Sequence, residues 1–255
     1  MLKSRLCIAF FAFAVGCAPA QKPLTDYVNP MLGTATLWDS VDLGFKPTKR
    51  TWGAEVFPGS SLPNAMVQVS PVTKFHSGAG YQYEDSVIYG FTHTNKGHWN
   101  LCHIPLLPVT GTPTPGDYCS PFSHERESAA PGYYQVFLDR YGVDAQLSST
   151  LRCAFHKYTY PAGAAASLLA DLQRSNEHVR AWDIRKEGDN VFAGWQQTGE
   201  KMYFYAVANR PVTGIEPVVE GDREVRIVRF GEGDGALELR IGFSFVSEKS
   251  ARENL

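Results

Sequence analysis

Hydrophobic positions along this chain recur in short runs, and clusters of turn-forming residues separate them. Runs that are rich in branched and aromatic side chains and bounded by Gly, Asp and Asn are typical of β-strands. The predicted strands are residues 65–69, 133–138, 155–160, 191–197, 202–208, 224–230 and 236–246. Residues 187–190, 220–222 and 231–235 have the turn chemistry that joins antiparallel strands. Together these features predict an all-β fold, a large antiparallel β-sandwich.

A helix is predicted at the C-terminus. Ser250-Ala251-Arg252-Glu253 has the S-x-x-E pattern of a capping box, and it follows the strand expected to end near Val246. We therefore expect residues 247–255 to be the start of a helical linker, at which the polypeptide is interrupted.

The N-terminus has the pattern of an export signal. Lys3 and Arg5 precede an apolar run that is too short to span a bilayer. Two processing sites remain open: a lipobox ending at Cys17, which would be lipidated, and cleavage after residues 18–20, before Gln21. The expected organisation is a signal at 1–20 and one β-sandwich domain at 21–246, in an exported protein that is periplasmic or anchored to the membrane as a lipoprotein.

Charge and cysteine content exclude some functions. Without Lys3 and Arg5 the chain has 22 basic and 26 acidic residues and no run of like charges, so nucleic acid is not an expected partner. Cys102, Cys119 and Cys153 are an odd set that cannot all pair within one chain. A bridge between Cys102 and Cys119 remains open, and a free Cys153 is either a pocket residue or a small buried hydrophobe.

Residues 81–100, YQYEDSVIYGFTHTNKGHWN, combine aromatic rings, histidines, amides and one lysine. Apolar ring faces beside neutral hydrogen-bonding groups suit a sugar, which offers C–H patches for stacking and hydroxyls for hydrogen bonds. Core packing of an aromatic-rich strand is the alternative.

A metal site is not predicted in this segment. His93, His98 and His103 are spaced by five, which places neighbours on opposite faces of a strand and far apart around a helix. The nearby carboxylates are expected to cap turns or face solvent; they are Glu55, Glu84, Asp85 and Glu125.

Several ordered blocks resemble the N-terminal domain of glycoside hydrolase family 92, the calcium-dependent exo-α-mannosidases. The blocks are NPMLGT (29–34), GAEVFPGSSLPNAMVQVSPVT (53–73), GYQYEDSVIYGFTHT (80–94), SAAPGYYQVFLDRYGV (128–143), TLRCAFHKYTYP (150–161) and ELRIGFSFVSEKSARENL (238–255). The resemblance implies a galactose-mutarotase-like supersandwich and an α-mannose-containing glycan, such as an N-glycan, as substrate.

In that family a larger (α/α)6 barrel carries the acid, the base and most calcium ligands. The resemblance therefore assigns no catalytic and no metal-binding residue to this chain, makes the barrel its expected partner, and implies that the chain alone is inactive. Two other interpretations remain: a free-standing carbohydrate-binding module, and a structural or interaction domain.

The resemblance also suggests site residues. After Gly90, Phe91, His93 and Thr94 the sequence departs from the family pattern, and Trp99 is a candidate platform for the aglycone while Lys96 is a candidate partner for an anionic substituent. In 152–156, alternate residues share a face of a strand, and the resemblance places Cys153 or Phe155 against the sugar. The predicted substrate-binding set is His93, Asn95, Lys96, His98, Trp99, Cys153 and Phe155.

Overall fold

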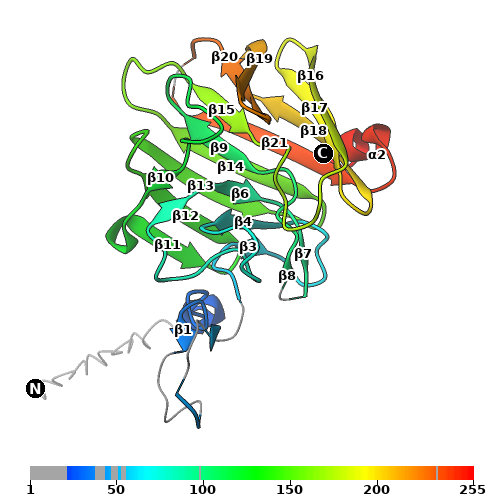
Figure 1. Cartoon of the computed structure of the whole chain (residues 1–255). Coiled ribbons are helices and arrows are strands. Elements are labelled where there is room, and N and C mark those ends of the chain that lie inside the picture. The colour runs from blue at the N-terminus through cyan, green and yellow to red at the C-terminus, as the bar shows by residue number, and fades with distance from the viewer. Residues whose placement is uncertain (1–21, 38–43, 47–50, 53–55, 98, 234) are drawn as a thin grey trace, which may run out of the picture.

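Two large antiparallel sheets face each other and enclose the core (Figure 1). The computed structural model describes residues 22–37, 44–46, 51–52, 56–97, 99–233 and 235–255. Residues 1–21, with the predicted signal and both processing sites, lie outside this part. The two sheets confirm the all-β sandwich predicted from the strand pattern.

The eight-stranded sheet contains most of the long strands. Its β12 alternates half-buried and buried residues, as expected for a strand with one face on the core. In spatial order its strands are β11 (Glu127–Ala130), β12 (Tyr133–Leu138), β13 (Val143–Ser149), β14 (Cys153–Thr159), β21 (Leu237–Ser244), β18 (Lys201–Ala208), β17 (Val191–Gln197) and β16 (Ala181–Gly188).

The seven-stranded sheet covers the other side of the core. All residues of its central strands β9 and β15 are buried, so both of their faces are covered. In spatial order its strands are β19 (Val212–Glu220), β20 (Arg223–Phe230), β15 (Ser167–Ala170), β9 (Leu106–Val109), β6 (Gly90–Thr92), β4 (Gln68–Val72) and β3 (Ser60–Ser61).

Among the described residues, three two-stranded pairs and several short helices lie outside the two large sheets. The two-stranded pairs are β1 (Thr36–Leu37) with β2 (Thr51–Trp52), β5 (Val87–Ile88) with β10 (Ser120–Pro121), and β7 (Asn95–Lys96) with β8 (Trp99–Asn100). The short helices are η1 (Leu24–Tyr27), η2 (His124–Arg126) and α2 (Glu248–Glu253). No helix in the described residues has the length and apolar character needed to cross a membrane.

Six of the predicted strands agree with the structure within two residues at each end, but the first is shifted by three residues. The strand predicted at 65–69 is β4 at Gln68–Val72. The N–H of Ala65 donates to the Leu62 carbonyl in a turn, and the N–H groups of Met66 and Val67 donate to the Leu151 carbonyl. These backbone groups are therefore used before the sheet begins.

The predicted turns have two different outcomes. Residues 187–190 and 220–222 connect neighbouring strands of one sheet, β16 to β17 and β19 to β20. Residues 231–235 instead lead from β20 in the seven-stranded sheet to β21 in the eight-stranded sheet. Turn composition signals a change of direction, and it carries no information about which sheet the next strand joins.

The predicted C-terminal helix is present, but its N-cap lies three residues before Ser250, where the capping-box pattern predicted it. Ser247 is the N-cap, and its hydroxyl accepts from the N–H of Ser250 at 3.0 Å, so Ser250 lies inside α2. The helix packs closely on β21, where a Cβ on Gly242 would lie 2.1 Å from the Ala251 carbonyl oxygen. Glycine at 242 is therefore what allows the helix to cover this strand.

Candidate functional site

One end of the sandwich gathers loops from both sheets, and we call it the loop end. The strand registers place the start of β14, the end of β21, the start of β18 and the end of β17 at the same level. Contacts between the sheets confirm this arrangement: Met66 N–H donates to the Leu151 carbonyl at 2.9 Å, and Ile104 N–H donates to Gln196 Oε1 at 2.8 Å. The loop end consists of residues 62–67, 93–97, 99–105, 150–152, 171–180, 198–200, 221–222 and 245–247.

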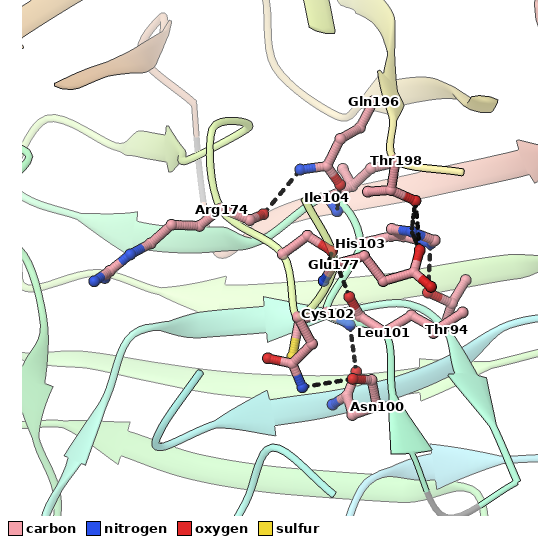
Figure 2. Close-up of polar contacts among 12 residues, drawn as sticks. Thr94, Asn100, Leu101, Cys102, His103, Ile104, Arg174, Glu177, Gln196 and Thr198 are labelled. Carbon is pink, nitrogen blue, oxygen red and sulfur yellow. Dashed lines mark hydrogen bonds and ion pairs between the residues drawn. The ribbon is translucent and has the colours of Figure 1, made fainter. Parts of the chain in front are cut away.

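A chain of hydrogen bonds, buried except at Glu177, joins three of these loops through His103 (Figure 2). Thr198 Oγ1 donates its single proton to Glu177 Oε2 at 2.7 Å, so it accepts from His103 Nε2–H at 3.0 Å. His103 Nδ1 is then an acceptor, and Thr94 Oγ1 donates to it at 2.9 Å. Burial lowers the pKa of His103 to about 4, and the Glu177 carboxylate partly opposes this effect.

The backbone beside His103 adopts an unusual conformation. Cys102 and Ile104 have φ values of 54° and 53°, in the left-handed region that β-branched residues such as Ile rarely occupy. Side-chain oxygens hold both positions: Asn100 Oδ1 accepts from Cys102 N–H at 2.7 Å, and Gln196 Oε1 accepts from Ile104 N–H at 2.8 Å. Figure 2 shows both bonds. The surroundings therefore fix a strained segment, which is a common property of functional regions.

His93 lies inside the sandwich and not on a surface. Its side chain is fully buried, and its Nε2 is 3.2 Å from His156 Nε2, with the two rings stacked at 5.1 Å. Burial lowers the pKa of His93 to about 3, and burial together with the neighbouring His93 lowers the pKa of His156 well below its ordinary value. Both imidazoles are thus neutral, and in this chain His93 contacts protein groups of the core.

The other predicted residues of the aromatic segment divide between core and surface. Tyr81 and Phe91 are buried in the core, so the packing interpretation holds for them. Lys96 is exposed and Trp99 is half-buried in the β7–β8 hairpin, while His98 lies outside the described residues. Both amide atoms of Asn95 are buried and have no hydrogen-bond partner in the described part of the chain.

Cys153 and Phe155 face outward from β14, as the alternation predicted, while Ala154 and His156 face the core. They line a hollow of about 260 Å³ together with Arg240 and the C-terminal residues Asn254 and Leu255. The Cys153 thiol donates to the Asn254 carbonyl. The hollow and the β7–β8 hairpin belong to the same end of the sandwich, but no hydrogen bond or ring contact between described residues joins them.

A second hollow of about 350 Å³ lies next to the first, and Asn254 lines both. Its wall includes Leu151, Phe245 and Val246, which are 53%, 40% and 79% exposed. Apolar side chains exposed together at a loop cluster often mark a contact surface. The sequence did not reveal this patch, because the strand was expected to continue to Val246 whereas β21 ends at Ser244.

The cysteines and acidic residues form no metal centre in the described part of the chain. Cys102, Cys119 and Cys153 are all free, so the disulfide between Cys102 and Cys119 that the sequence allowed is not formed. The described residues contain no group of three or more His, Cys, Asp or Glu side chains that could hold a metal ion.

Comparison with solved structures identifies the architecture. The family GH92 α-mannosidase BT3965 from Bacteroides thetaiotaomicron is 26% identical, with a TM-score of 0.78 over 92% of this chain and 35% of that chain. Its complex with mannoimidazole gives 25% identity and a TM-score of 0.76, over 91% of this chain and 34% of that chain. The family GH92 inverting mannosidase BT2199 from the same species, at 22% identity and a TM-score of 0.72 over 92% of this chain and 33% of that chain, shares the fold.

The chain spans about a third of the length of these solved relatives. No curated protein shows a significant match to it. Residues 27–247 match the family model described as the glycosyl hydrolase family 92 N-terminal domain. The match covers most of the sequence and confirms the resemblance seen in the ordered blocks, so the chain belongs to glycoside hydrolase family 92, as its N-terminal domain.

Proposed function

We propose that the loop end forms one wall of an α-mannoside-binding pocket, and that an (α/α)6 catalytic domain forms the opposite wall. The observation that carries this proposal is the pair of adjoining hollows at the loop end, with Cys153 and Phe155 in one and the exposed Leu151, Phe245 and Val246 in the other. The match to family 92 supports mannose as the sugar.

The residues of this chain would bind and orient the sugar, while the chemistry comes from the partner domain. Phe155 offers an apolar ring to the C–H face of a sugar, and Arg240 in the same hollow offers donors to its hydroxyls. Hydrolysis with inversion requires an acid and a base carboxylate roughly 6.5–9.5 Å apart. We assign neither role, and no calcium ligand, to this chain, so on this proposal the isolated chain does not hydrolyse α-mannosides.

The β7–β8 hairpin would supply a more distant part of the pocket. The indole of Trp99 and the buried, unpartnered amide of Asn95 offer stacking and hydrogen bonding, and Lys96 offers a positive charge.

The test is to join this chain to the catalytic domain of a family 92 relative and measure hydrolysis of α-mannobiose in calcium. Phe155→Ala and Trp99→Ala should each lower kcat/KM by about tenfold, because each removes an aromatic contact with the substrate. Lys157→Ala is the matched control, since Lys157 lies on the same face of β14 outside the hollow. Enzyme-like turnover by the chain alone, or unchanged kcat/KM in both aromatic variants, would contradict the proposal.

A further inference from the structure

A third hollow at the loop end has a different chemistry from the two described above. Its volume is about 510 Å³, within the roughly 300–1,000 Å³ typical of small-molecule sites. It lies between the 171–180 loop, the start of β16 and the β19–β20 turn, and β16 and β19 are neighbours in the fold (Figure 1). It is lined by Gln173, Val179, Arg180, Ala181, Trp182 and Asp222, with Arg223, and it shares no lining residue with the hollows around Asn254.

Trp182 gives this hollow an aromatic wall that is held in place. The indole is half-buried against the core, on the edge strand β16. The Arg226 guanidinium lies 5.2 Å from the ring centroid and is itself paired with Glu224 at 2.8 Å. A fixed indole at the wall of a hollow is suited to stacking on the C–H face of a sugar ring.

Hydrogen bonds within the protein also hold two polar side chains of the wall in place before any ligand binds. Gln173 Oε1 accepts from the Glu224 N–H at 2.8 Å, which leaves the amide NH₂ as a donor. Arg223 donates to Asp171, whose fully buried carboxylate also accepts from the Tyr118 hydroxyl at 2.6 Å. The carboxylate compensates the charge of Arg223 and restricts its motion, so a ligand would lose less binding energy to ordering of these groups.

The two remaining polar groups are uncommitted. The Arg180 guanidinium and the Asp222 carboxylate have no hydrogen bond or ion pair with any other described residue, although both line the hollow. The Arg180 guanidinium is a positively charged donor, and the Asp222 carboxylate is a negatively charged acceptor. With Arg223 compensated by Asp171, the wall carries no excess charge that would select an anion, whereas hydroxyl groups both donate and accept.

We propose that this hollow is a second saccharide-binding site, which takes a neutral hexose unit of an oligosaccharide by stacking on Trp182 and by hydrogen bonds to Gln173, Arg180 and Asp222. The choice of mannose as the hexose rests on the proposed function, and the site deepens that function by contacting the glycan at a second place. A glycan held here would remain attached while another of its branches is processed.

The experiment is a calorimetric titration of the 255-residue chain with α-linked mannotriose. Trp182→Ala should weaken binding at least tenfold, and Arg180→Gln and Asp222→Asn about threefold to tenfold each. Trp195→Ala is the matched control, because Trp195 is a half-buried tryptophan of the adjacent strand β17, covered by Lys201 at 3.8 Å, and it does not line the hollow. It should bind as the unsubstituted chain does.

Separate variants distinguish this site from the pocket of the proposed function. If Trp99→Ala or Phe155→Ala abolishes binding while Trp182→Ala and Asp222→Asn leave it unchanged, the second site is wrong and the proposed pocket stands. Absence of binding by the unsubstituted chain, or competition by sulfate at millimolar concentration, would also overturn the second site. If Trp182→Ala fails to fold, Arg180→Gln decides, since the Arg180 guanidinium is exposed and has no partner among the described residues.

Discussion

Polar groups at the loop end occupy two layers that behave differently. In the inner, buried layer, the His103 bond to Thr198 links loops of the two sheets, and Asp171 joins the end of β15 to Tyr118 and to the start of β20. In the outer layer, at the surface, the Arg180 guanidinium and the Asp222 carboxylate have no hydrogen-bond or ion-pair partner among the described residues. The difference indicates that the inner layer determines structure and that the outer layer is available to ligands.

The largest expected effect comes from removing the carboxylate at the centre of the inner layer. Asp171→Ala leaves the Tyr118 hydroxyl and the Arg223 guanidinium without their acceptor. We expect a loss of about 3 kcal/mol in the free energy of unfolding, near the lower end for buried pairs because Arg223 keeps some solvent contact. Urea denaturation measures this value. A loss below about 0.5 kcal/mol would show that Asp171 does not stabilise the fold as a member of the inner layer should.

The next largest effect is expected from acid, which protonates the buried histidines of the inner layer and the core. In the folded chain the pKa values of His93 and His103 are about 3 and about 4, below the ordinary value of 6.5, so between pH 6.5 and 4 the unfolded chain binds more protons. Stability should therefore fall as pH falls, by at most about 1.4 kcal/mol per pH unit for each of these histidines.

Thermal unfolding across this pH window tests the effect, with His103→Gln as the comparison. The variant should lose a smaller amount of stability per pH unit than the unsubstituted chain, because one of the responsible groups is removed. Equal slopes in the two proteins would show that His103 is not buried and neutral in solution.

The smallest effect is expected in the outer layer. Arg180→Gln removes an exposed guanidinium that has no described partner, so the free energy of unfolding should change by no more than about 0.5 kcal/mol. Urea denaturation under the conditions used for Asp171→Ala gives the comparison. A loss of 2 kcal/mol or more would remove the distinction between the layers.

Strand pattern and ordered motifs were enough to predict the fold and the family. Strands β12 and β17 lie where they were expected, because each is a short run rich in β-forming residues with turn residues beside it, and β12 also alternates core and outward residues. The outward orientation of Cys153 and Phe155 followed from the same alternation. Positions such as these depend on local periodicity, which a single sequence contains.

Only the tertiary structure decided which candidate residues are buried and which are accessible. His93 was a candidate ligand residue by composition, yet its ring stacks on His156, 63 positions away, inside the core. The hollow at Trp182 combines three segments that are apart in sequence, and the patch around Phe245 depends on where β21 ends. Sequence determined the strands and the family because both are carried by local patterns, whereas burial and juxtaposition are set by how distant strands pack, which a local pattern does not contain.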